Sequence, residues 1–408
     1  MARPKQLRIV VAAFGDAGHA FPAIALAREL HRRGNEVLIE TWEEWEDAVK
    51  AEGLNFTAAQ EYMVFPPPGP ETPQGQTVAH AARALADLMG RFEPDLVVSD
   101  ILTLAPTLAA EVAGVRHATL IPHVYPVQQP GQPIYSLGFW PARTSIGRRM
   151  WGASMPLIDN GLRRGRDEMN VTRERLGLPP LERFHGGISE TLALVGTYPQ
   201  LEYPRKWQAG THVTGPLFFE LAADPVEAPE GPDPLVVVAP STAQDRECDL
   251  VRAALAGLAD EPVRVLATIN RREPTEPIEV PSNAVLTNWI PYSQVMPQAD
   301  LVVSHGGHGT VVRALHSGAP VLCCPAGGDM GENGARVSWS GAGLSLPRRL
   351  VSPRGVRLAA RRILSDEHSR ARAREIAAWS AANDGAERAA HLVEETARNG
   401  SSRLAPTS

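Results

Sequence analysis

The sequence has few cysteines, little excess charge and no long apolar run. Cys248, Cys323 and Cys324 are the only cysteines in 408 residues, too few for a disulfide framework, and inert thiols are expected. The formal net charge is −6, and Lys and Arg form no stripe with interleaved aromatic residues, so nucleic acid is not an expected partner. No apolar run reaches membrane-spanning length, and no signal-peptide core follows Met1, so we expect no membrane insertion and a cytoplasmic protein.

What the chain does contain is a repeated alternation of strands and helices. A strand at 7–14, a helix at 21–33 and a strand at 36–40 open the pattern, which restarts with the apolar run 235–239. Such alternation predicts an α/β fold with two Rossmann-like αβα domains facing each other across a cleft. We place an N-terminal domain at 1–216, a Pro/Ala/acid-rich linker at 217–234 and a second domain at 235–375. A C-terminal helix at 376–398 and a disordered tail at 399–408 complete the prediction.

A glycine-rich turn follows the expected strand 301–304. It reads Ser304-His305-Gly306-Gly307-His308-Gly309-Thr310 and opens a helix that ends at Gly318. Free backbone N–H groups and a helix dipole converge there, which suits phosphate oxygens. Glycines such as Gly307 and Gly309 allow close approach, and His305 and Thr310 would donate hydrogen bonds. The residue pattern of this turn matches neither the dinucleotide-binding fingerprint nor the P-loop motif.

Several motifs, occurring in one order, carry a family resemblance over nearly the whole chain. They are Gly18-His19-x-x-Pro22, Asp100 at a strand end, Val213-Thr214-Gly215-Pro216, Asn288-Trp289-Ile290-Pro291, His305 to Thr310, and Pro325 to Asp329. Together they resemble the GT-B-fold, nucleotide-sugar-dependent glycosyltransferases of the natural-product, macrolide and plant small-molecule family. The resemblance also implies that the C-terminal helix crosses back onto the N-terminal domain.

The resemblance implies a catalytic pair in the N-terminal domain. His19 would be the base that takes the proton of the acceptor, and Asp100 would orient its ring and stabilise the imidazolium. The alternative is that His19 only begins a helix and that Asp100 only caps the next one.

On the donor side, the resemblance assigns the diphosphate and the sugar to the second domain. Besides His305, Gly307, Gly309 and Thr310, the implied donor-binding residues are Ser241, Thr242, Trp289, Asp329, Met330 and Asn333. Trp289 would stack on the base, although a tryptophan fills a core equally well. The sequence shows no convincing metal-ligand spacing, so neither metal nor cofactor is expected, and the nucleotide sugar is a co-substrate.

Two residues depart from the family pattern. Many relatives have Glu at the position of Arg313 to bind both ribose hydroxyls, and a guanidinium cannot accept those protons. A dTDP-sugar is therefore as compatible as a UDP-sugar. Met330 stands where a glutamine commonly grips the sugar, which points to a deoxysugar or a differently held hexose.

The acceptor is expected in the N-terminal domain. Between 122 and 156 the periodicity fails, and we expect a long loop there. Together with Phe65, the aromatic side chains of this loop would form an apolar pocket for a phenolic or polyketide-like molecule that offers a hydroxyl. The loop residues are Tyr125, Tyr135, Phe139 and Trp140. These aromatic residues would equally well pack the loop onto its own domain.

The sequence thus predicts an inverting, metal-independent glycosyltransferase, with three alternatives. A lipid-linked cell-wall precursor glycosyltransferase should carry an apolar and basic membrane-docking face on the N-terminal domain, and the sequence shows none clearly. A nucleotide-sugar epimerase would need no acceptor. A degenerate glycosyltransferase serving as a binding partner is suggested only by Arg313 and Met330. A homodimer is left open.

Overall fold

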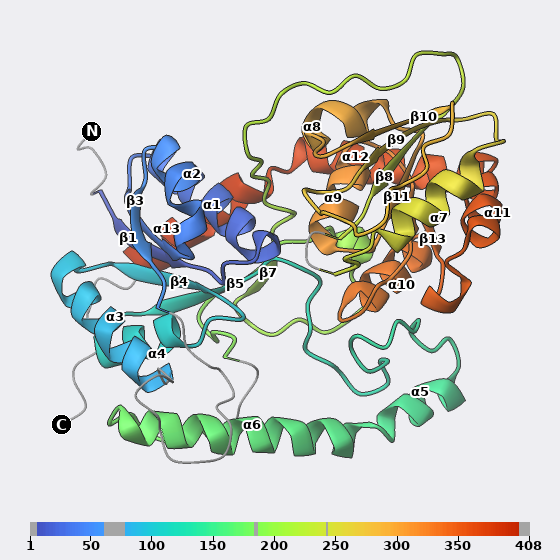
Figure 1. Cartoon of the computed structure of the whole chain (residues 1–408). Helices are drawn as coiled ribbons and strands as arrows, with labels where there is room; N and C mark the ends of the chain where they lie inside the picture. Colours follow the sequence, from blue (N-terminus) through green and yellow to red (C-terminus); the bar gives the residue numbers. More distant parts are fainter. Residues whose placement is uncertain (1–5, 61–77, 183–186, 242–243, 400–408) are drawn as a thin grey trace.

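The chain folds around two separate parallel sheets, which are shown in the computed structural model of Figure 1. The structure describes residues 6–60, 78–182, 187–241 and 244–399. The first sheet has the order β3-β2-β1-β4-β5-β6-β7. Its strands are β1 (Arg8–Ala12), β2 (Glu36–Thr41), β3 (Asn55–Ala58), β4 (Leu96–Asp100), β5 (His117–Ile121), β6 (Ala193–Val195) and β7 (Thr211–Val213).

Helices cover both faces of this sheet, because its central strands are apolar on both sides. Residues of one face, such as Ile9 and Val11, pack against α1 (Ala17–Arg32), whereas Val10 and Val97 pack against the helices of the other face. That other face is covered by α3 (Val78–Phe92) and α4 (Ala105–Val112). Two short helices, η1 (Glu43–Trp45) and α2 (Glu46–Ala51), connect β2 to β3.

The second sheet has the order β10-β9-β8-β11-β12-β13. Its strands are β8 (Leu235–Ala239), β9 (Arg264–Thr268), β10 (Ala284–Thr287), β11 (Leu301–Ser304), β12 (Val321–Cys323) and β13 (Gly343–Ser345). The helices of this half begin with α7 (Asp249–Leu258), α8 (Tyr292–Val295), α9 (His308–His316) and α10 (Met330–Ser340). Short 3-10 turns occur at η2 (Pro199–Leu201), η3 (Met296–Gln298) and η4 (Arg348–Leu350). The α/β fold class with two Rossmann-like units is confirmed.

Three helices end the described chain: α11 (Pro353–Leu364), α12 (Glu367–Ala382) and α13 (Gly385–Arg398). The helix expected at 376–398 is thus divided, because Asn383 and Asp384 interrupt it and Asp384 caps α13. The first part, in α12, packs on α9 beside the second sheet. The helix α13 packs on α1, and Ala389, Ala390 and Val393 join the core of the first sheet.

One expected loop contains a helix. Residues 122–144 are irregular, but α5 (Ser145–Gly152) follows, capped by Thr144, whose hydroxyl accepts from the N–H of Gly147 at 3.1 Å. The long α6 (Met155–Arg175) comes next and runs along the lower side of the molecule in Figure 1. The sequence of α5 is short and contains two glycines and two arginines, and none of its residues is buried, so it lacks the core-facing stripe that marks most helices. The tail beyond 399 lies outside the described residues.

Candidate active site

The site lies where each sheet reverses its strand order. In the first sheet β1 and β4 are neighbours, with Ala12 beside Ser99, while the connections from them run to opposite sides. In the second sheet β8 and β11 are the corresponding pair, with Ala239 beside Ser304. Segments leaving the carboxyl ends of such pairs splay apart and leave a crevice, which is where ligands bind in parallel sheets.

His19 and Asp100 meet at the crevice of the first sheet. His19 is in the first turn of α1, which begins at Ala17 rather than at Phe21 as the sequence suggested, and Asp100 ends β4. The Nδ1 atom of His19 lies 2.7 Å from Oδ2 of the buried Asp100, whose Oδ1 accepts from the N–H of Leu102 at 2.8 Å. A carboxylate at Nδ1 keeps the proton there and leaves the Nε2 lone pair as the base.

The electrostatics of this pair suit a general base. Burial by itself lowers the pKa of His19, but the charge of Asp100 and its hydrogen bond more than offset burial, and the pKa is raised above its ordinary value. Asp16 and Asp329 add smaller effects in the same direction. Because Asp329 follows a strand of the second sheet, its field at His19 indicates that the two halves face each other across the crevice.

Aromatic and histidine rings surround His19, and the sequence reasoning missed them. Phe14 lies edge-on to His19 at 6.1 Å between ring centroids and to Trp42 at 5.1 Å. His123 lies 5.9 Å from His19 on another side, and its Nδ1 donates to the main-chain oxygen of Val124 at 2.8 Å. Burial lowers the pKa of His123, so its ring is neutral beside the base. Only the spacing of His123 after an expected strand would have marked it.

The glycine-rich turn adopts the geometry expected of it. Its residues 305–307 follow β11, and α9 begins at His308. Gly306 has φ of +85°, and a Cβ on Gly307 would lie 2.2 Å from Nε2 of His305, so the ring occupies the space that a side chain would need. No atom beyond its chain neighbours and the backbone of α9 lies within 4 Å of a Cβ built on Gly309, which leaves the start of α9 open to a ligand.

His305 is held in place from behind. Its Nδ1 lies 3.3 Å from the main-chain oxygen of Ala239, and burial lowers its pKa. With the Nδ1 proton directed at a carbonyl, Nε2 donates to an anion only after taking a second proton, which a diphosphate nearby would favour. His308, another ring that the sequence reasoning passed over, contacts the main-chain oxygen of Gly196 through Nε2 at 3.2 Å, and burial lowers its pKa to about 4.

Three donor-side candidates on or beside α10 have different surroundings. Asp329 is the half-buried N-cap of α10. Met330 is buried, and its main-chain oxygen would lie 3.0 Å from a Cβ on Gly306, so it backs the turn. Asn333 donates from Nδ2 to the main-chain oxygen of Gly306 at 2.9 Å and fixes the turn on α10. Their contacts with a sugar stay predictions.

The remaining donor-side candidates follow strands of the second sheet or lie in the first turn of α9. Ser241 follows β8, is buried and accepts from the N–H of Gln244 at 2.9 Å, while Thr242 lies outside the described residues. Thr310 is half-buried in the first turn of α9. Trp289 is half-buried, and the guanidinium of Arg271 lies 4.5 Å above its ring, which supports the indole on one face.

Arg313 is directed towards residues 218–220 of the linker. It donates to the main-chain oxygen of Phe219, lies 5.3 Å over the ring of Phe218 and is 3.7 Å from the carboxylate of Glu220. Glu220 in turn accepts from the N–H of Tyr292 at 2.9 Å. The arginine that replaces the family glutamate therefore holds the linker against α8 and α9.

The expected acceptor residues are dispersed. Tyr135 lies 6.4 Å from His123, and its hydroxyl is buried without a hydrogen-bond partner among the described residues. Tyr125 is 2% exposed, and its hydroxyl donates to Oε1 of Gln208 at 3.0 Å, so the ring is part of a buried network, and its contact with an acceptor stays a prediction. Phe139 and Trp140 are 53% and 44% exposed and lie on the surface. Phe65 lies outside the described residues.

Phe139 and Trp140 lie in a stretch of the chain that has further exposed apolar and basic side chains. Exposed apolar side chains continue into α5 and α6 with Ile146, Met150 and Leu157, and the arginines of 143–164 are exposed between them. In the described part of the chain, no helix is long and apolar enough to cross a membrane.

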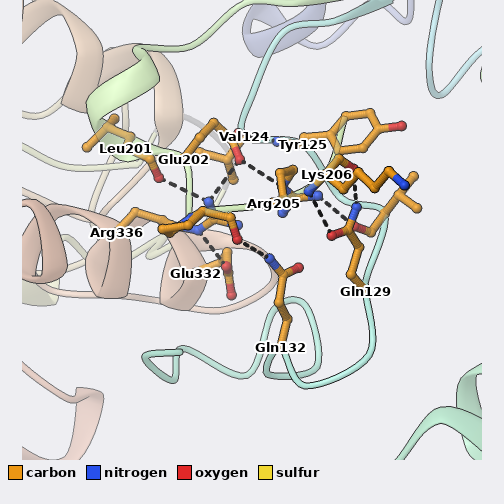
Figure 2. Close-up of polar contacts among 12 residues, drawn as sticks. Val124, Tyr125, Gln129, Gln132, Leu201, Glu202, Arg205, Lys206, Glu332 and Arg336 are labelled. Carbon is orange, nitrogen blue, oxygen red and sulfur yellow. Dashed lines mark hydrogen bonds and ion pairs between the residues drawn. The ribbon is translucent and has the colours of Figure 1, made fainter. Parts of the chain in front are cut away.

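A buried ionic network joins the two halves beside the site, as Figure 2 shows. Arg336 of α10 is 2% exposed, and its Nε donates to Glu332 at 2.8 Å. Its Nη1 donates to the main-chain oxygen of Leu201 at 3.0 Å and to Glu202 at 3.1 Å. Glu202 also accepts from the N–H of Tyr125 at 2.7 Å, so α10 is tied to the loops of the N-terminal half.

Among the described residues, no cluster of three or more His, Cys, Asp and Glu side chains could hold a metal ion. The three cysteines are free and buried, and burial raises the pKa of Cys324 to about 12. The thiols are therefore held in their protonated form.

Two facing doubly wound sheets, with the His19–Asp100 pair at the switch point of one and the glycine-rich start of α9 at that of the other, define the GT-B architecture. Family models match both halves: residues 9–117 match the glycosyltransferase family 28 N-terminal domain, and residues 252–395 match the erythromycin biosynthesis protein CIII-like C-terminal domain. The chain belongs to the GT-B-fold, nucleotide-sugar-dependent glycosyltransferases of the natural-product family.

Individual relatives agree with this assignment. The chain is 29% identical to 4'-demethylrebeccamycin synthase of Lentzea aerocolonigenes, over 95% of this chain and 99% of that protein. It is 27% identical to O-mycaminosyltylonolide 6-deoxyallosyltransferase of Streptomyces fradiae, over 96% and 98%. The crystal structure of the kitacinnamycin glycosyltransferase has the same fold, with a TM-score of 0.76 at 21% identity over 96% of this chain and 100% of that one.

Proposed function

We propose that this chain is an inverting glycosyltransferase that moves a hexose or deoxyhexose from a UDP- or dTDP-sugar to a hydroxyl of an apolar small molecule. The observation that carries the proposal is the His19–Asp100 pair at one switch point, facing the His305–Thr310 turn at the other. The natural-product names of the relatives support the acceptor class. The proposed place of action is the cytoplasm, and no metal or cofactor takes part.

In the proposed reaction, Nε2 of His19 takes the proton of the acceptor hydroxyl. The acceptor oxygen bonds to the anomeric carbon while the bond from that carbon to the diphosphate breaks on the opposite face. The configuration at the anomeric carbon is therefore inverted. Backbone N–H groups at the start of α9 and the dipole of that helix stabilise the departing diphosphate. Asp100 stabilises the imidazolium that forms.

Incubation with UDP- and dTDP-hexoses and mixed phenolic and macrolide acceptors tests the proposal. We expect a glycoside whose anomeric configuration, read by NMR, is opposite to that of the donor. Retained configuration would contradict the role of His19 as base. A changed sugar nucleotide formed without an acceptor would indicate an epimerase, and turnover confined to a lipid-linked acceptor would indicate the cell-wall alternative.

The nucleotide is the second part of the proposal. Arg313 is committed to Phe219 and Glu220, so no carboxylate at that position accepts from a 2′-hydroxyl. We expect titration calorimetry to show that dTDP binds at least as tightly as UDP. A dissociation constant tenfold lower for UDP would exclude this reading while leaving glycosyl transfer intact.

A further inference from the structure

A cavity of about 370 Å³ lies between the outer strands of the first sheet and α3. Glu40 of β2 and Thr57 of β3, which are partners in register, form one wall. Helix α3 forms the other wall, with Leu85 on the inside and the exposed Asp87 and Arg91 at the entrance. This volume is at the small end of ligand pockets.

Glu40 is unusual among the buried acids of this chain. It is 8% exposed, and its carboxyl has no hydrogen-bond or ionic partner among the described residues. By contrast, Asp100 bonds His19, Glu202 bonds Arg336 and Glu394 bonds Asn35. An unpaired buried carboxylate is costly, so a partner supplied from outside would relieve that cost.

The alternation of side chains along β2 shows which side of the sheet the Glu40 side chain faces. Leu38, two residues before Glu40, packs with Leu85 and Met89 of α3. Because residues i and i+2 of a strand face the same side, Glu40 faces α3 too. Ile39 faces the opposite side, towards α1, which carries His19. The cavity is therefore separate from the proposed catalytic crevice.

We propose that this cavity binds a small organic cation, with an ammonium group against the Glu40 carboxylate and an apolar body against α3. An anion is disfavoured because the negative charge of the Glu40 carboxylate would repel it. A neutral apolar molecule is disfavoured because it would leave that carboxylate unpaired. Thr57 offers a hydroxyl oxygen as a second acceptor for the ammonium. Asp87 at the entrance offsets the opposite charge of Arg91, so the entrance does not repel a cation as a whole.

The pH dependence of binding follows from the same carboxyl group. Burial raises the pKa of Glu40 to about 7, and the other charged groups facing the cavity are Asp87 and Arg91 of α3. An alkylammonium stays protonated at both pH 6 and pH 8, whereas the ionised fraction of a group with a pKa near 7 rises about tenfold between them. A cation that needs the carboxylate should therefore bind about tenfold more tightly at pH 8.

Ligand-observed NMR titration of the full chain with cyclohexylmethylamine tests this site. Cyclohexylmethanol is the neutral control of the same shape, and Glu40→Gln keeps the size of the side chain while removing its charge. We expect the amine to bind about tenfold more tightly at pH 8 than at pH 6, and the Glu40→Gln variant to lose that pH dependence and bind amine and alcohol alike. Asp87→Asn should weaken amine binding by less.

The proposal would be overturned by equal binding of amine and alcohol by the native chain, by unchanged amine binding by the Glu40→Gln variant, or by no amine binding at pH 8. None of these results depends on glycosyl transfer. Competition by dTDP for the same amine would place the probe in the catalytic crevice and would also contradict a separate site.

Discussion

Replacing His19 with alanine is expected to lower kcat by about 1,000-fold, because general-base catalysis by a positioned side chain typically contributes 10²- to 10⁴-fold. The half-buried ring lies in the first turn of α1 and does not belong to the core, so the variant should fold normally. Steady-state kinetics with the best donor and acceptor from the panel would measure the loss. The dissociation constant for dTDP should stay within about threefold, since the donor binds the opposite sheet.

Asp100→Asn is the matched control for this assignment. In the native chain the rate should fall as pH falls through the raised pKa of His19, because the protonated ring is no base. Removing the charge of Asp100 lowers that pKa, so the acid limb of the pH–rate profile should move to lower pH while the maximal rate falls. An acid limb that moves upward, or a His19→Ala variant with native kcat, would remove the proposed base.

The parts of this site that the sequence predicted depend on strand ends. The family resemblance singled out His19, Asp100 and His305, and each stands within a few residues of an apolar run, at the end of a sheet where parallel topology gathers such positions. The glycine turn was readable for the same reason. The α/β fold class followed from the alternation of strands and helices, because each element is predicted by the periodicity of apolar residues in a short window of sequence.

The parts that the sequence did not predict depend on contacts between distant positions. Tyr125 is as aromatic as Tyr135, and only the position of Glu202, 77 residues later, decides that Tyr125 is buried in a network. The direction of Arg313 was equally hidden, because its partners lie in the linker 93 to 94 residues earlier. Neither the burial of Tyr125 nor the direction of the Arg313 side chain is encoded in a local sequence pattern.

Arg336 is the residue of such a long-range network whose loss should cost most. Arg336→Leu removes the cation that Glu202 and Glu332 share, and breaking a buried ion pair in this way typically destabilises a protein by about 3–5 kcal/mol. The ring of Tyr203, 3.7 Å from the guanidinium, would lose its stacked partner as well. Chemical denaturation, followed by far-UV circular dichroism, measures the change in the free energy of unfolding.

The double variant Arg336→Leu/Glu202→Leu separates charge burial from packing. If the single variant is unstable because it leaves carboxylates without a cation, removing one of them should restore part of the loss, and the double variant should lose less than the sum of the two single changes. Arg336 also ties α10, and with it Asn333 and the glycine-rich turn, to Leu201 of the other half. The single variant should therefore raise the KM for the nucleotide sugar at pH 7. A loss of less than 1 kcal/mol together with an unchanged KM would show that the network neither stabilises the chain nor positions the donor site.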